Sequence, residues 1–148
     1  YGLVTRGRGY VALFESRGRT VQVFFDQTPS TVLAMKTQYA GVIASHRGLA
    51  GGQRRPDIIL VSEVGADRRV VLVEMKNSAD GRYLSDSVYK VFGYLFDLGL
   101  AVADRIRAVL VVPTGVSAAS TGSRAAIAVA SGDDRPGFAK AIGDALGL

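Results

Sequence analysis

Three short apolar runs and one amphipathic segment between them place the tightest limit on how this chain folds. The runs cover residues 57–61, 70–75 and 106–112, and each has the length and the Val, Ile and Leu content of a buried strand. Apolar side chains at spacings of three and four over residues 88–98 predict a helix between the second run and the third. Strands interleaved with helices in this way favour an α/β or α+β domain, with a mixed central sheet flanked by helices.

The other expected elements extend this sheet and cover it. Two β-rich runs at residues 10–14 and 20–25, joined by a polar link, predict an N-terminal hairpin. The first two apolar runs, linked by residues 62–69, are expected to pair antiparallel. Between the hairpin and the first apolar run we predict a helix over residues 32–40, capped by Ser30 or Thr31, and a basic loop over 45–55. A polar turn over 77–82 precedes the long helix, which we expect Ser85 or Asp86 to cap. The third apolar run is followed by a loop over 115–123, a strand over 125–130 and a last helix capped by Asp133 or Asp134.

Size and composition indicate one compact domain. Of the 148 residues, 48% are apolar, which is enough to form a core. We therefore predict a single domain over residues 1–148. Because the first residue is Tyr1 and not Met, we expect that the domain is excised from a longer protein. No apolar stretch approaches the roughly 18 residues of a membrane span, so we expect no membrane partner.

The residue types restrict the chemistry that the chain can carry. It has no Cys, which excludes thiol nucleophiles and cysteine zinc sites and fits a reducing, cytoplasmic location. A single His, His46, makes a histidine triad or a histidine zinc site improbable. Catalysis would therefore depend on carboxylates, Lys, Arg, Tyr, Ser or Thr.

Charged residues stand at the ends of two strands that are predicted to pair. Asp57 opens the first strand, and Glu74 and Lys76 end the second. Glu74 and Lys76 are two apart on a strand, so they point to the same face. In an antiparallel pair, the start of one strand lies opposite the end of the other. We therefore expect Asp57, Glu74 and Lys76 to converge at one edge of the sheet.

Two carboxylates and a backbone carbonyl at that edge would form a hard-oxygen site suited to Mg²⁺ or Mn²⁺. A neighbouring Lys can orient a metal-bound water and stabilise the negative charge that grows on a phosphate. The chemistry implied is metal-assisted phosphodiester hydrolysis. The alternative is structural, because Glu and Lys at strand ends are commonly solvated, and Glu74 and Lys76 could form a surface ion pair that contributes little.

The ordered set from about residue 54 to residue 112 resembles the PD-(D/E)xK nucleases, the restriction-endonuclease-like superfamily. The set consists of Pro56-Asp57 before one strand, Glu74-Met75-Lys76 at the end of the next, and a helix after it. The resemblance implies a core of α-β-β-β-α-β order. It also implies that Asp57, Glu74 and the Met75 backbone carbonyl bind the metal, and that Lys76 positions the attacking water.

Two features depart from that family's pattern. Several branches carry Gln-x-x-x-Tyr on the helix after the triplet, and here Lys90 replaces the Gln four residues before Tyr94. Many members also carry an additional acid on an earlier helix. Glu15 is the candidate for that acid in this chain, although it falls in a predicted strand, and Asp26 is a poorer one.

Basic and aromatic residues near these positions are candidates for contacts with nucleic acid. The chain carries 18 Lys and Arg against 13 Asp and Glu, a net charge of +5. Cations that flank the carboxylates would hold phosphates without reading sequence. The candidates are Arg54, Arg55, Arg82, Lys90 and Tyr94. Tyr94 could either stack on a base or pack in the core, whereas we expect Tyr89 to pack in the core.

Together these observations predict a Mg²⁺-dependent (or Mn²⁺-dependent) DNA endonuclease domain, and we favour a setting in restriction or phage defence. A homodimer is a reasonable expectation, as are other domains or subunits of a larger complex. The competing hypothesis is a catalytically inactive nucleic-acid-binding or scaffolding module of the same fold.

Overall fold

The structure, a computed structural model, describes residues 9–35, 37–51, 55–102, 105–113 and 126–148. Within these residues the chain forms a six-stranded mixed sheet and four helices, which confirms the expected mixed α/β class. In chain order the elements are β1 (Ala12–Ser16), β2 (Arg19–Phe25), α1 (Pro29–Leu33), α2 (Gln38–Ser45), β3 (Ile58–Val64), β4 (Asp67–Met75), α3 (Gly81–Val102), β5 (Ile106–Val112), β6 (Ile127–Ser131) and α4 (Arg135–Leu146).

The strands lie in the sheet in the same order as in the sequence. β1 to β4 form an antiparallel meander, whereas β4, β5 and β6 are parallel. α3 makes the crossover from β4 to β5 that a parallel pair requires. The predicted N-terminal hairpin is confirmed. Its two-residue turn has positive φ at both Arg17 and Gly18, as the tight hairpin turns that match strand twist require.

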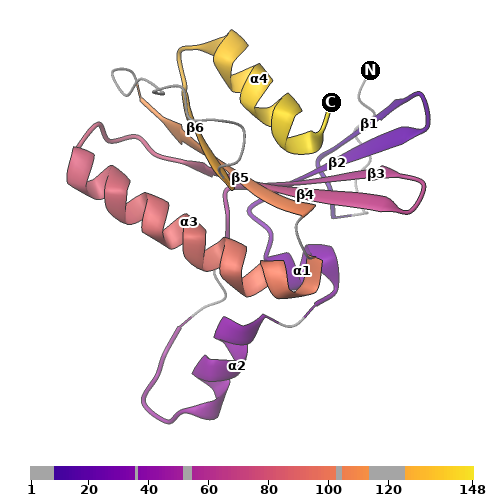
Figure 1. The fold of residues 1–148 in the computed structure, drawn as a ribbon. Coiled ribbons are helices and arrows are strands. Elements are labelled where there is room, and N and C mark those ends of the chain that lie inside the picture. The colour runs from indigo at the N-terminus through magenta and orange to yellow at the C-terminus, as the bar shows by residue number, and fades with distance from the viewer. Residues whose placement is uncertain (1–8, 36, 52–54, 103–104, 114–125) are drawn as a thin grey trace.

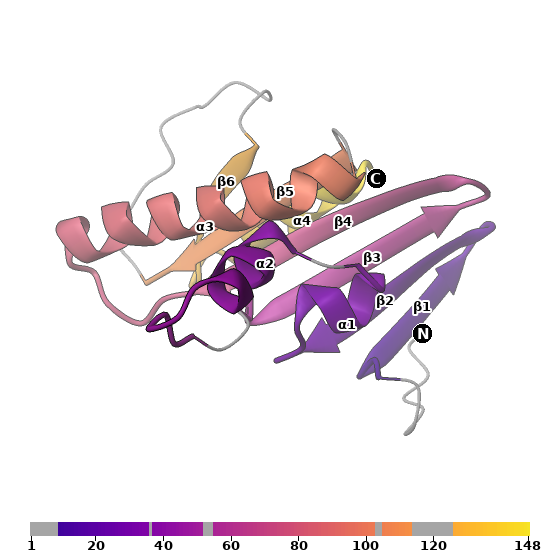
Figure 2. The same cartoon turned by 90° about the horizontal axis from the view of Figure 1, so that it is seen from below.

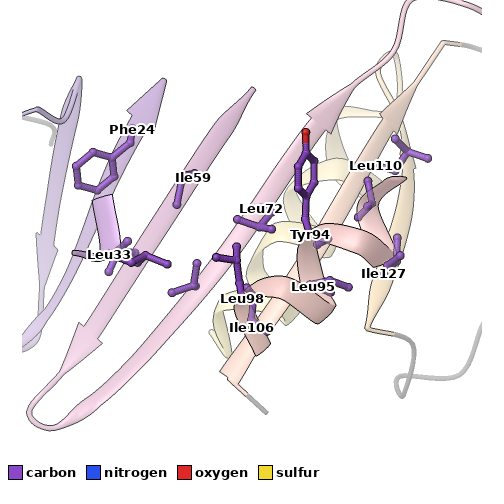
Figure 3. Packing of buried hydrophobic residues seen from close by; sticks show 14 of the residues in the cluster. Phe24, Leu33, Ile59, Leu72, Tyr94, Leu95, Leu98, Ile106, Leu110 and Ile127 are labelled. Carbon is purple, nitrogen blue, oxygen red and sulfur yellow. The ribbon is translucent and has the colours of Figure 1, made fainter. Parts of the chain in front are cut away.

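Helices cover both faces of the sheet, so the domain has three layers. α3 and α1 lie on one face and α4 lies on the other (Figure 1). Figure 2 shows α3 crossing its face of the sheet obliquely. Alternate residues of each central strand serve the two sides. On β4, Val70 and Leu72 pack beneath α3, whereas Val71 and Val73 pack beneath α4. Figure 3 shows the packing on the α3 side.

The short helix α2 stands apart from these layers. Figure 1 shows it extending beyond α1 and α3, and none of its residues is buried. It begins where Thr37 accepts a hydrogen bond from the Ala40 N–H, and its first turn is tied to α3 because the Tyr39 N–H donates to the Asp97 carboxylate at 3.0 Å.

The single helix predicted over residues 32–40 is wrong, because two short helices occupy this region. α1 is capped by Thr28 instead of Ser30 or Thr31, and it ends at Ala34, which has a left-handed φ of 52°. Thr37 then caps a new helix. Two Thr N-caps nine residues apart thus divide the apolar pattern between two separate helices. The basic loop expected over 45–55 is described in part, since residues 52–54 lie outside the described ranges.

Several predicted boundaries also need correction. The link over residues 62–69 is mostly strand, since β3 and β4 continue to a turn at Gly65 and Ala66. Charged residues there pair across the strands, with Arg68 3.4 Å from Glu63, so the polar sequence does not end the ladder. α3 begins at Gly81, before its predicted caps at Ser85 or Asp86, because Asp80 accepts a hydrogen bond from the Tyr83 N–H at 2.7 Å.

The C-terminal third agrees more closely with expectation. β5 has the predicted bounds, and Asp134 caps α4 by accepting from the Gly137 N–H at 3.0 Å. β6 lies one to two residues later than predicted. The loop expected over residues 115–123 falls outside the described residues. No helix in the described part of the chain is both long enough and apolar enough to cross a membrane.

Leu72 tests whether the central strand carries the stability of the domain. It lies on β4 between β3 and β5 and is 1% exposed. We expect Leu72→Ala to lower the free energy of unfolding by about 3 kcal/mol, through lost burial and the cavity left behind. Urea denaturation measures this loss. The matched control is Leu148→Ala, because Leu148 is 72% exposed and its truncation should change stability little. Equal losses for the two variants would contradict the central role of β4.

Candidate functional site

The candidate site lies where β4 ends and β3 begins, on the face that α3 covers. Glu74 follows Val70 and Leu72 on that face by strict alternation, and Lys76 continues the series. The β3–β4 register pairs Ile58 with Val73. One further step places Asp57 opposite Glu74, so both carboxylates belong to the α3 face and lie at the edge of the sheet where the sequence predicted that they converge.

Asp57 is held in this place by the backbone around it. Its Oδ2 accepts a hydrogen bond of 2.6 Å from the backbone N–H of Met75, the residue between Glu74 and Lys76. The Asp57 backbone carbonyl accepts from the Asp26 N–H at 3.0 Å, which fastens the start of β3 to the end of β2. The first predicted acid and the predicted acid-x-Lys triplet are therefore in direct contact.

Glu74 is the centre of the cluster. Its side chain is only 5% exposed, and its Oε1 accepts hydrogen bonds from two ammonium groups. The Lys76 Nζ lies 2.5 Å from this oxygen, and the Lys90 Nζ of α3 lies 2.8 Å from it. A buried carboxylate is expensive unless it is paired, and here both charges come from residues that the sequence had singled out.

The two lysines differ in their surroundings. The Lys76 side chain is 10% exposed, and its ammonium lies 5.9 Å from the centre of the Tyr83 ring. Its backbone N–H donates to the Val111 carbonyl at 2.8 Å, which continues the β4–β5 ladder. The Lys90 side chain is 38% exposed, and its ammonium lies 5.5 Å from the centre of the Tyr94 ring. Lys76 is thus enclosed, whereas Lys90 borders solvent.

The charge of Glu74 outweighs desolvation at Lys90. Partial burial lowers the pKa of Lys90, but the hydrogen bond and the Coulombic attraction to Glu74, with a smaller contribution from Tyr94, raise its pKa above the ordinary 10.5. Because the pKa is higher in the folded state, the stabilising contribution is fully present at neutral pH. It is lost only as pH rises through that raised value.

One buried oxygen at the site has no protein partner. Glu74 Oε2 is buried and accepts no hydrogen bond. A buried carboxylate oxygen without a hydrogen-bond donor can coordinate a cation. The two carboxylates and the Met75 carbonyl provide the hard oxygen ligands that Mg²⁺ or Mn²⁺ prefers. The described residues contain no group of three or more His, Cys, Asp or Glu side chains placed to hold a metal ion. A metal here would therefore depend on the pair Asp57 and Glu74.

The structure does not bring Glu15 to this site. Glu15 pairs with Thr20, and Thr20 pairs with Glu63, so Glu15 lies at the opposite end of the strands from Asp57. The sheet register thus excludes it as the additional acid. Asp26, the poorer candidate from sequence, is the nearer of the two, because its N–H contacts the Asp57 carbonyl. Its carboxylate lies 3.7 Å from the Arg55 guanidinium.

The predicted nucleic-acid contacts are distributed unevenly around the site. Lys90 is part of it, and Arg82 is exposed near the start of α3. Arg55 forms the ion pair with Asp26, and Arg54 lies outside the described residues. Tyr94 is 5% exposed in the core, and its hydroxyl donates to the Arg55 carbonyl at 3.4 Å, which favours packing over stacking.

The prediction that Tyr89 packs in the core is wrong, since this residue is 83% exposed. Sequence reasoning also assigned Lys90 to phosphate and missed its contact with Glu74. The spacing shows only that Lys90 and Tyr94, four apart, share one face of α3. Which part of the sheet that face meets depends on how α3 is docked.

No protein-family model, no curated protein and no solved structure matches this chain.

The burial of Glu74 predicts that its charge matters to stability. We expect Glu74→Ala to lower the free energy of unfolding by about 3 kcal/mol, because it leaves the enclosed Lys76 without a counter-charge. Glu63→Ala is the matched control. It removes an exposed carboxylate from the same sheet, and breaking its surface pair with Arg68 should cost less than about 1 kcal/mol. Urea denaturation of both variants at neutral pH measures the difference, and a loss at Glu74 no larger than at Glu63 would contradict the burial argument.

Proposed function

We propose that this domain is a Mg²⁺-dependent (or Mn²⁺-dependent) endonuclease of the PD-(D/E)xK type that hydrolyses phosphodiester bonds in DNA. The observation that carries the proposal is the buried Glu74 carboxylate. It is flanked by Lys76 and opposed by Asp57, and one of its oxygens has no protein partner. Acids and a lysine arranged this way at the edge of a sheet suit metal-assisted phosphoryl chemistry.

The topology supports a restriction-endonuclease-like core. β2, β3 and β4 form an antiparallel meander, α3 follows, and β5 returns parallel to β4. These elements follow the β-β-β-α-β part of the order that the resemblance implies. The two short helices α1 and α2 are inserted between β2 and β3. The candidate acids stand at the start of the second of these strands and the end of the third.

Each residue has a distinct task under this proposal. Asp57, Glu74 and the Met75 carbonyl would hold the metal ion, which polarises a phosphate oxygen and lowers the pKa of bound water. Lys76 is fixed by its backbone bond to β5 and by Glu74, so its ammonium can orient the attacking water. Its positive charge also stabilises the charge that develops on the phosphate.

A long acid-free segment supports nucleic acid as the partner. Residues 27–56 contain no Asp and no Glu, and they contain Lys36, Arg47, Arg54 and Arg55. This segment includes α2, which extends from the body with no buried residue, and it leads directly into Asp57. A basic segment without acids that leads to the candidate carboxylates would attract a phosphate backbone.

We place this activity in restriction or phage defence within the cytoplasm, with the domain acting as the nuclease part of a larger protein or complex. Cutting both strands of a duplex would be served by a homodimer with two such sites.

Plasmid nicking tests the proposal. We expect supercoiled DNA to be cut with Mg²⁺ or Mn²⁺ and not with EDTA. Lys76→Met should lower the rate by at least about 100-fold, the typical contribution of a positioned proton-transfer group. Asp57→Asn should lower it similarly through loss of a metal ligand, although its side-chain oxygen can still accept from the Met75 N–H.

The matched control for Lys76 is Lys140→Met. Lys140 forms an exposed pair with Asp144 on α4, and α4 covers the other face of the sheet. This variant should cut at the wild-type rate. Wild-type cutting by folded Lys76→Met or Asp57→Asn protein would show that the site is assigned to the wrong residues.

The second candidate function is a nucleic-acid-binding or scaffolding module without catalysis. One observation favours it, because both ammonium groups already neutralise Glu74 Oε1 and no third acid joins the site in the described residues. Such a module would bind DNA equally well with EDTA and would cut in no metal.

Salt dependence tests the nucleic-acid surface that both candidates share. We expect Arg82→Ala to weaken DNA binding in EDTA. For each phosphate that the variant no longer neutralises, the slope of log affinity against log salt should fall by about 0.9. Fluorescence anisotropy at several salt concentrations measures it. Arg135→Ala on α4 is the control, since that exposed arginine belongs to the helix on the opposite face. Equal changes in DNA affinity for the two variants would show that α3 is not part of the DNA-binding surface.

A further inference from the structure

We propose that the Lys90 ammonium is the resident counter-ion of Glu74 that a divalent metal ion must displace, so that Lys90 sets the metal affinity of this site. The inference rests on the proposed function, because it concerns the same carboxylate. It adds a competitor for the metal within the chain itself.

The competition follows from where the charges lie. Both lysines contact one oxygen of Glu74, at 2.5 Å for Lys76 and 2.8 Å for Lys90. A metal ion bound to this carboxylate would lie within a few ångströms of both ammonium groups. Repulsion at such distances is strong because little water separates the charges in a buried site. The carboxylate therefore cannot keep both lysines and also bind a divalent cation.

Binding of the metal ion to the second oxygen of Glu74 does not avoid this repulsion. Glu74 Oε2 has no hydrogen-bond partner, yet it is also buried from solvent. The Glu74 side chain as a whole is only 5% exposed. A cation can reach Oε2 only after the groups around the carboxylate open, and of the two lysines that contact Glu74 it is Lys90 that borders solvent.

Lys90 is the lysine that can leave. The Lys76 side chain is 10% exposed, and its backbone is fixed to Val111 of β5. The Lys90 side chain is 38% exposed and extends from the surface of α3 on a flexible stem, so its ammonium can move into water without breaking a backbone hydrogen bond. Once displaced, it stands beside the metal as a cation for phosphate oxygens.

Metal titration of the intact protein tests this role directly. MnCl₂ is titrated by calorimetry, without DNA, into wild type, Lys90→Gln and Lys90→Arg. We expect Lys90→Gln to bind Mn²⁺ about tenfold more tightly than wild type, because a competing charge is gone. Lys90→Arg keeps the charge and should stay close to wild type. Lys140→Gln removes a distant charge and controls for net charge.

The outcomes separate this inference from the proposed function. Tighter binding by the neutral variants Lys90→Gln and Lys90→Met, but not by Lys90→Arg or Lys140→Gln, supports displacement, as does binding that appears only in the neutral Lys90 variants. Binding by wild type that Asp57→Asn abolishes, with Lys90→Gln no tighter, overturns the role of Lys90 and leaves the metal site intact. No Mn²⁺ binding by any variant overturns both. Lys90→Met is a second neutral variant, and circular dichroism confirms that each protein is folded.

Discussion

A carboxylate buried at the end of a central strand is the constraint on which this structure depends. Glu74 occupies the next place on the face of β4 where Val70 and Leu72 form the core, so its charge cannot reach bulk water along that face. Lys76, directly after the same strand, and Lys90 from α3 neutralise this charge, and the backbone N–H of Met75 donates to Asp57. The Glu74 side chain therefore couples the docking of α3 to the end of β4, and the hydrogen bond from the Met75 N–H to Asp57 joins the start of β3 to the same place.

Contacts fixed by strand geometry were predictable from the sequence. Alternation places Glu74 and Lys76 on one face, and an antiparallel pair with a short link places Asp57 opposite Glu74. No knowledge of the helices is needed for either step, which is why the placement of these three residues together was predicted correctly. The bounds of β5 were also predicted, since a continuous apolar run that ends at Pro113 leaves little freedom for a buried strand.

Contacts that depend on packing between elements were not predictable in this way. Lys90 meets Glu74 only because α3 crosses the sheet in one particular position, and helical spacing cannot supply that position. The same uncertainty explains why Tyr89 was assigned to the core and is exposed, whereas Tyr94 is buried. Local chemistry caused the other errors. Thr37 caps a second helix, and the Glu63–Arg68 pair continues a ladder through residues that look like a loop.

The energetic cost of the cluster favours a chemical role over a purely structural one. Buried ion pairs are often no more stabilising than apolar residues of similar size, because desolvation offsets the attraction. At position 72, two residues earlier on the same face, this chain uses Leu, which gains stability by burial alone. Glu74 instead requires two lysines and still leaves Oε2 without a partner. Because apolar residues often replace a buried ion cluster without loss of stability, the presence of these charges supports the proposal that they serve a chemical task.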